Sequence, residues 1–291
     1  MKIRIAKNSG FCFGVKRAIK MAMDKSEKYN KLSTLGPIIH NPQMVSKLEN
    51  QGVKSIESLE ESSGEPIIIR SHGITSSTYN QLHKMNVEII DATCPYVKNA
   101  QESGAKLSKE GYTVFIVGSA NHPEVKAISS YIDGESYIVK TPEEIPKKNF
   151  SKIGVVCQTT QQFSKLEAIV QKLIHQSKEI RIINTICTAT TLRQESTRKL
   201  AQDCDIMIVI GGKNSSNTKM LAVISKEFIP TYHIETENEI KEKWFKNVEN
   251  IGLTAGASTP DWIITNVYNK IINLLGFPSG TVNNVEDIPG Y

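Results

Sequence analysis

The sequence predicts an α/β fold in which parallel β-strands alternate with helices, arranged as three similar lobes. Strand-length runs such as IMIVI at 206–210 are apolar at every position, which is typical of parallel strands covered by helices on both faces. A turn and an amphipathic segment follow most of these runs. Cys12, Cys94 and Cys187 each follow a strand candidate, about a third of the chain apart, so three similar lobes would bring equivalent strand ends to a shared centre.

The individual elements follow from these patterns. Segments rich in β-branched and other apolar residues are predicted as strands: residues 2–6, 66–70, 87–91, 112–118, 152–157, 179–183, 205–211, 231–235 and 250–255. Segments with helical spacing are predicted as helices: residues 15–28, 42–50, 75–84, 96–109, 123–131, 162–176, 192–202, 219–228 and 260–275. Pro42, Pro95, Pro123 and Pro260 suit a first helical turn, where a missing N–H costs nothing.

The predicted lobes are closely packed, because no low-complexity linker separates them. The first lobe comprises residues 13–94, the second 95–186, and the third 187–277 together with an N-terminal strand in 1–12. Residues 278–291 lack helical periodicity and are predicted as a tail that packs on the body.

Composition narrows the class of protein. The 291 residues are 39% hydrophobic and 22% charged, which is ordinary for a globular chain. No run approaches the roughly 18 apolar residues of a membrane span, and the start MKIRIAKNSG is too polar for a signal peptide.

The odd count of five cysteines favours reduced thiols and a cytoplasmic location. The net charge of +5 is spread along the chain, which argues against a nucleic-acid partner but helps to attract an anionic substrate.

Cys12, Cys94 and Cys187 are the candidate metal ligands. Each stands at a predicted strand-to-helix junction, where a helix N-terminus stabilises a thiolate. Such thiolates hold iron–sulfur clusters, and three ligands leave one coordination position open for chemistry. Zinc is the rival, but a closed zinc site usually has CxxC pairs, which this sequence lacks. Cys157 and Cys204 are predicted to be buried apolar residues.

Three histidines lie beside Pro or Gly where strands end: His40 in GPIIHNP, His72 in RSHG and His122 in NHPEV. Together with a serine-rich loop they could bind a diphosphate through charge-assisted hydrogen bonds, although Arg or Lys is the more usual choice. The remaining histidines are predicted to be structural: His83, His175 and His233.

The serine-rich loop is GGKNSSNTKML at 211–221, which follows a strand and opens a helix. Ser215, Ser216 and Asn217 would present hydroxyl and amide groups at the helix N-terminus, a natural anion site. Simple N-capping is the alternative, but one such residue suffices for a cap. Ser258 in GASTP is a second instance. Neither segment is a P-loop.

Glu124 follows His122 and Pro123 at a predicted helix start. It either compensates the helix dipole or donates protons to a ligand. Thr159 and Thr160, in CQTTQQ, could bond to a substrate oxygen and pass on a proton, or else cap the next helix.

Taken together, these motifs resemble the LytB/IspH family of 4-hydroxy-3-methylbut-2-enyl diphosphate reductases. The resemblance runs from GFCFGVKRAI through GPIIHNP, RSHG, DATCPYV, HPEV, QTT, NTICTAT and IGGKNSSNT to GLTAGASTP, covering residues 10–260 in order. Two departures are RSHG in place of the expected RAHG, and HPEVKAISSY, which lacks an expected glycine.

The resemblance implies a trefoil of three α/β lobes around one central [4Fe–4S] cluster held by Cys12, Cys94 and Cys187. It implies Glu124 and Thr159 as catalytic residues. It also implies a set of substrate-binding residues: His40, His72, His122, Thr159, Thr160, Ser215, Ser216, Asn217 and Ser258.

The implied reaction is reductive dehydroxylation of (E)-4-hydroxy-3-methylbut-2-enyl diphosphate to isopentenyl and dimethylallyl diphosphate, the last step of the non-mevalonate isoprenoid pathway. Electrons would come from reduced ferredoxin or flavodoxin, in agreement with the absence of a dinucleotide fingerprint from the sequence. Two other classes stay open. An aconitase-type hydro-lyase would need arginines for carboxylates, and a cluster-bearing redox sensor would need neither Glu124 nor the anion loops.

Overall fold

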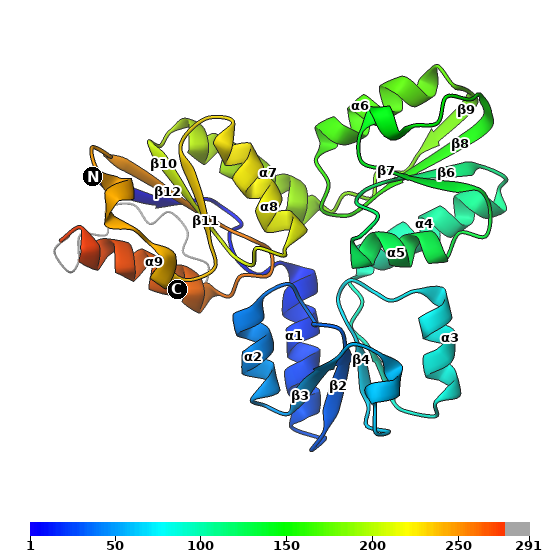
Figure 1. Cartoon of the computed structure of the whole chain (residues 1–291), viewed down its shortest axis with the longest axis horizontal. Coiled ribbons are helices and arrows are strands. Elements are labelled where there is room, and N and C mark those ends of the chain that lie inside the picture. The colour runs from blue at the N-terminus through cyan, green and yellow to red at the C-terminus, as the bar shows by residue number, and fades with distance from the viewer. Residues whose placement is uncertain (277–291) are drawn as a thin grey trace. The chain divides into compact units, whose positions relative to one another are not determined.

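The computed structural model describes residues 1–276, whose strands form three four-stranded parallel sheets (Figure 1). The sheet orders are β1-β12-β10-β11, β3-β2-β4-β5 and β7-β6-β8-β9. The strands are β1 (Lys2–Ile5), β2 (Leu32–Leu35), β3 (Val53–Ile56), β4 (Ile67–Ile69), β5 (Ile89–Asp91), β6 (Thr113–Val117), β7 (Ser136–Val139), β8 (Phe150–Cys157), β9 (Ser177–Ile182), β10 (Ile206–Ile210), β11 (Thr231–Ile234) and β12 (Asn250–Ala255). The predicted fold class is confirmed.

Within residues 1–276, nine α-helices connect and cover these strands, at the positions predicted. They are α1 (Phe13–Ser26), α2 (Pro42–Glu49), α3 (Ser76–Lys84), α4 (Pro95–Lys109), α5 (Pro123–Ser130), α6 (Phe163–Ile174), α7 (Thr188–Gln202), α8 (Ser216–Lys226) and α9 (Asp261–Leu274). Short 3-10 turns add η1 (Leu59–Glu61), η2 (Pro142–Glu144), η3 (Glu237–Glu239) and η4 (Glu242–Phe245).

Three of the four prolines predicted to lie in a first helical turn do so. Pro42, Pro95 and Pro123 are the first residues of their helices, where the missing N–H is not needed. Pro260 is instead the N-cap of α9, which begins one residue later. Likewise His175, predicted within a helix, is the C-cap of α6.

The central strands have the buried character that their sequences predict. Every residue of β4 and β10 is buried, with at most 1% of any side chain exposed. Because both faces are covered, apolar residues occupy both alternating sets of positions. The loops after these strands carry the candidate site residues, as expected for parallel sheets.

The chain divides into two compact units. The terminal unit comprises residues 1–13, 40–44 and the described residues from 188 onward, and it contains the β1-β12-β10-β11 sheet. The central unit comprises residues 14–39 and 45–187 and contains the other two sheets.

The three-lobe boundaries stay a prediction. The predicted tail, residues 278–291, lies outside the described residues, as does residue 277 at the end of the third lobe. Across residues 1–276, no helix combines the length and apolar character that crossing a membrane requires.

Candidate active site

Glu124 and Thr159 form a buried hydrogen-bonded pair in the central unit. Glu124 is the second residue of α5 and only 2% exposed. The Thr159 N–H donates to Glu124 Oε1 at 2.5 Å, and the Thr159 hydroxyl donates to Oε2 at 3.0 Å. At the helix start, the N-cap residue His122 accepts the Glu124 N–H on Nδ1 at 3.2 Å. Thr159 therefore holds the carboxyl group in position, while His122 fixes the backbone of Glu124.

Burial raises the pKa of Glu124 to about 7, although the two hydrogen bonds from Thr159 oppose the shift. Loss of water disfavours the charged carboxylate, whereas donors favour it. A carboxyl group with a pKa near neutrality can both hold and release a proton at the pH of the cell. This is the property that a general acid requires.

The raised pKa predicts an unusual dependence of stability on pH. The folded chain retains the Glu124 proton up to about pH 7, whereas an unfolded glutamic acid loses it near 4.5. This contribution to stability is thus complete below about pH 4.5 and is lost as the pH rises through 7. Glu124→Gln should become more stable relative to wild type over that range, by up to about 3 kcal/mol. Urea denaturation of both proteins at pH 5 and pH 8 measures the difference; an equal difference at both pH values would contradict the shift.

Two predicted substrate-binding histidines of the central unit lie together. The rings of His72, after β4, and His122, before α5, have centroids 5.9 Å apart and meet at 77°. Thr160 lies close to Thr159 along the chain, and its hydroxyl accepts from Gln158 Nε2 at 2.9 Å. The alternative role for these threonines, capping of α6, is wrong, since Gln162 is the N-cap.

Both cysteine ligand candidates of the central unit are tied to these loops. The Cys94 N–H donates to the carbonyl of Ser71, and the Cys187 N–H donates to the carbonyl of Thr159, each at 3.0 Å. A Cβ added at Gly14 would lie 2.5 Å from Cys94 Sγ, so glycine keeps the space beside this sulfur open.

The terminal unit gathers the remaining candidates. The Cys12 N–H donates to the Ala257 carbonyl at 3.1 Å, and the Ser258 hydroxyl donates to the His40 carbonyl at 3.0 Å. A Cβ at Gly212 would lie 2.6 Å from that same His40 oxygen. The loops that carry Cys12, His40 and Ser258 are thereby joined, and the loop before α8 reaches them.

The start of α8 presents the serine-rich motif as predicted. Ser215 is the N-cap and accepts the Thr218 N–H, and Ser216 is the first helical residue. Asn217 is 4% exposed, and neither its amide oxygen nor its amide nitrogen has a hydrogen-bond partner within the described chain. Since a buried amide usually finds partners, Asn217 is suited to a ligand.

The cysteines fall into two chemical classes. Cys12, Cys94 and Cys187 are partly exposed and directly precede α1, α4 and α7. Cys157 and Cys204 are buried, and burial raises the pKa of their thiols to about 12 and about 11. These two stay protonated, as expected of structural residues.

The three ligand candidates are divided between the units. Cys12 belongs to the terminal unit, and Cys94 and Cys187 belong to the central unit. Over residues 1–276, no group of three or more His, Cys, Asp or Glu side chains is positioned to hold a metal ion.

Two arginines near the cysteines were not identified from the sequence. Arg17 on α1 donates to the carbonyls of Asp91 and Thr93 at 3.3 and 3.2 Å, next to Cys94. Arg193 on α7, 2% exposed, donates to the Gly10 carbonyl at 2.9 Å, two residues before Cys12. The sequence offers only a weak signal for these two arginines. Each lies on an amphipathic helix, and that helix directly follows one of the motif cysteines.

Comparison with known proteins gives one consistent answer. The chain is 50% identical over 273 residues to a 4-hydroxy-3-methylbut-2-enyl diphosphate reductase of Geobacter sulfurreducens, covering 93% of this chain and 97% of the relative. It is 47% identical to the protein of the same name from Syntrophotalea carbinolica, covering 94% and 99%.

Solved structures agree with these relatives. A structure titled as (E)-4-hydroxy-3-methyl-but-2-enyl diphosphate reductase, the terminal enzyme of the non-mevalonate pathway, matches with 48% identity and a TM-score of 0.70, covering 94% of this chain and all of that chain. The Plasmodium falciparum E-1-hydroxy-2-methyl-but-2-enyl-4-diphosphate reductase matches with 30% identity and a TM-score of 0.87, covering 100% of this chain and 94% of that one. The family model described as LytB protein matches residues 3–272. The chain therefore belongs to the LytB family.

Proposed function

We propose that this chain is a 4-hydroxy-3-methylbut-2-enyl diphosphate reductase. It would remove the hydroxyl group of (E)-4-hydroxy-3-methylbut-2-enyl diphosphate reductively, giving isopentenyl and dimethylallyl diphosphate. The observation that carries the proposal is the Glu124–Thr159 pair, a poised acid held beside the loop of Cys187. The name shared by relatives about half identical over their whole length supports the same activity.

The proposed cofactor is one [4Fe–4S] cluster per chain, with Cys12, Cys94 and Cys187 as its ligands. The donor set fits this group, because these thiols are partly exposed and precede helix N-termini, where a thiolate is favoured. The space beside Cys94 that Gly14 preserves also suits it. When bound, the cluster would supply single electrons and an open iron that acts as a Lewis acid toward the substrate hydroxyl.

The proposed diphosphate-binding groups come from both units. Ser215, Ser216 and Asn217 lie at the N-terminus of α8, where N–H groups and the helix dipole favour an anion. His40, Ser258, His72 and His122 complete the proposed set. The diphosphate would supply binding energy remote from the reacting carbon, which can be used to orient the apolar part of the substrate.

The proposed proton donor is Glu124, with Thr159 as its partner. Below its pKa of about 7 the buried carboxyl is protonated, so it has a proton to give when the hydroxyl leaves as water. Thr159 holds both carboxyl oxygens and could pass the proton through its hydroxyl. Thr160 is proposed to contact the substrate.

Electrons would come from a protein partner, reduced ferredoxin or flavodoxin, since the sequence has no dinucleotide fingerprint. A cytoplasmic location belongs to the proposal, because cluster ligands must stay reduced.

Anaerobic turnover of the reconstituted protein with reduced methyl viologen tests the function directly. Oxidation of the dye with formation of both C5 diphosphates is the expected result. Hydration chemistry without dye oxidation would favour the hydro-lyase class. A cluster that is reduced and reoxidised without any product would favour a redox sensor.

Asn217→Ala is expected to raise the KM for the substrate by about 10-fold or more, since a hydrogen bond to a charged group contributes roughly 1.5–3 kcal/mol. Inhibition by inorganic diphosphate should weaken by a similar factor. The matched control is Asn99→Ala, an exposed asparagine on α4. An unchanged KM in the Asn217 variant would remove this residue from the site.

A further inference from the structure

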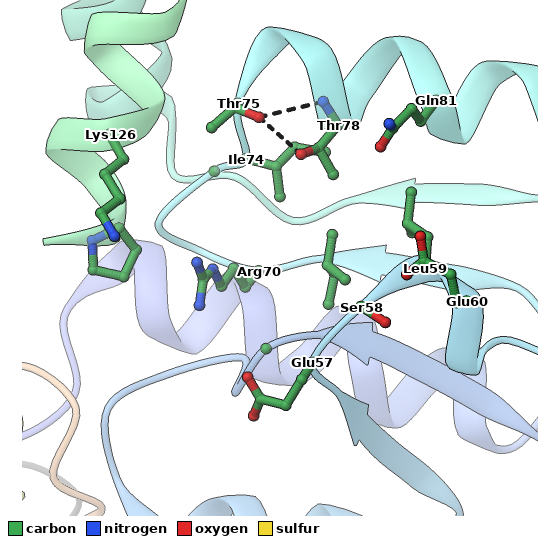
Figure 2. Close-up of a pocket in the computed structure, with 14 residues that line it drawn as sticks. Glu57, Ser58, Leu59, Glu60, Arg70, Ile74, Thr75, Thr78, Gln81 and Lys126 are labelled. Carbon is green, nitrogen blue, oxygen red and sulfur yellow. Dashed lines mark hydrogen bonds between the residues drawn. The ribbon is translucent and has the colours of Figure 1, made fainter. Parts of the chain in front are cut away.

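We propose that the central unit has a second anion-binding pocket, which takes the phosphate group of a small hydroxylated phosphate ester. The cavity, of about 330 Å³, lies at the carboxyl ends of β2, β3 and β4 (Figure 2). We call it the Arg70 pocket. It is lined by residues outside the proposed diphosphate set, among them Arg70, Lys126, Thr78, Gln81, Glu57 and Glu60. Its volume is at the lower end of the range for small-molecule sites.

Arg70 provides the main reason to expect an anion. Its guanidinium makes no hydrogen bond or ion pair with any described residue, and its Nε is buried without a partner. Burial lowers the pKa of Arg70, yet a guanidinium stays charged in proteins. A largely buried cation without an anion is unfavourable, and Arg forms paired hydrogen bonds to phosphate oxygens.

Other groups that line the cavity near Arg70 add positive electrostatic potential at the Arg70 end. Lys126, on the first turns of α5, is exposed and forms no ion pair with a described residue. Figure 2 shows Lys126 and Arg70 toward one side of the pocket, with Thr75 above them. Thr75 is the N-cap of α3, and Pro123 is the first residue of α5. Two helix N-termini thus line the cavity, and each favours an anion.

The two walls are held together independently of any ligand. The Ser76 N–H on α3 donates to the Ser130 hydroxyl at 2.9 Å, and the Ser76 hydroxyl donates to the Ser130 carbonyl at 2.6 Å. Gly36 leaves room for Arg70, because a Cβ at Gly36 would clash with Nη1. Pre-formed walls lower the entropy that a ligand must lose on binding.

The side of the pocket away from Lys126 is lined by hydrogen-bond acceptors, which indicates that the ligand also carries hydroxyl groups. Glu60 and Gln81 offer acceptors there, and Figure 2 shows Glu60 and Leu59 on the side away from Lys126, whereas Glu57 lies below Arg70. The Glu60 carboxylate would repel a second phosphate but accept hydrogen bonds from alcohols. Glu57 lies near enough to favour the charged form of Arg70 but makes no ion pair with it. The rival explanation is therefore that Glu57 is simply the counter-ion of Arg70.

Binding of glycerol 3-phosphate to the full chain, measured by titration calorimetry, tests the proposal. Asn217→Ala serves as the background, so that the proposed diphosphate site contributes little. We expect one site in this background, weakened at least 10-fold by Arg70→Met and several-fold by Arg70→Lys or Lys126→Met. Lys147→Met, which changes an exposed lysine of the same unit remote from the pocket, is the matched control and should change nothing.

Glu57→Gln separates the two explanations. If the pocket binds an anion, this variant should bind glycerol 3-phosphate as tightly as its background or more tightly. Affinity that is unaffected by Arg70→Lys and Lys126→Met would overturn the proposal. So would a loss of thermal stability in Glu57→Gln as large as that in Arg70→Met, because Glu57 would then be the counter-ion. None of these readouts depends on catalytic turnover, so the proposed reductase activity is tested separately.

Discussion

Glu124→Gln is expected to lower kcat by about 10²- to 10⁴-fold, the usual contribution of a positioned general acid, while the KM changes little. Glutamine can accept the Thr159 N–H and donate to the Thr159 hydroxyl, so the buried pair keeps its geometry. It cannot supply a proton. Steady-state kinetics with reduced methyl viologen would measure the effect, and iron analysis would verify that the cluster content is unchanged.

The matched control is Glu167→Gln on α6, where the side chain is exposed and the activity should stay at the wild-type level. A near-wild-type kcat in the Glu124 variant would show that another group delivers the proton. In the wild-type enzyme, kcat should also decline as the pH rises through about 7, because the buried carboxyl then loses the proton that it donates.

Alanine substitution of Cys12, Cys94 or Cys187 is expected to remove most of the iron and essentially all of the turnover. Each substitution removes one thiolate from a cluster that has only three protein ligands in the proposed arrangement. Iron and sulfide per chain, together with visible absorption, should be measured after anaerobic reconstitution.

Cys157→Ala and Cys204→Ala are the controls for this series. Both thiols lie in the hydrophobic core and stay protonated, so these variants should keep the cluster and lose only some stability through a small cavity. Full iron content in the Cys12, Cys94 or Cys187 variants, or its loss in the two controls, would contradict the ligand assignment.

The sequence predicts best those strands and helices whose structure is determined by their own residues alone. The five apolar residues of β10 suffice to indicate a strand with both faces covered. Three strands were missed: β2, β3 and β7, with the sequences LSTL, VKSI and SYIV. In β2 all four residues are buried even though two carry hydroxyl groups. β2 is a central strand, paired with β3 and β4 on either side, and no local pattern encodes that position.

The residues of the candidate site also divide into those that local sequence identifies and those that depend on contacts with distant segments. The cysteines, the histidines and the serine-rich loop were found because turn residues mark their positions in the sequence. Arg193 was not found, since its contact with Gly10 joins residues 183 positions apart. Two properties depend on burial by distant segments: the lack of hydrogen-bond partners at the Asn217 amide and the raised pKa of Glu124. The sequence can therefore suggest these residues, but it cannot predict their hydrogen bonding or protonation.

The pairing of β1 with β12 has a consequence for how the protein is made. Lys2 pairs with Asn250, so β1 can join its sheet only after the residues of β12 have been synthesised, whereas the 14–187 segment contains all the strands of its own two sheets. Contacts of such high sequence separation form slowly, and domains tend to fold as units during synthesis. The unit that contains Cys94 can therefore fold before the one that contains Cys12. In the proposed site, which needs Cys12, cluster assembly would therefore follow the synthesis of β12.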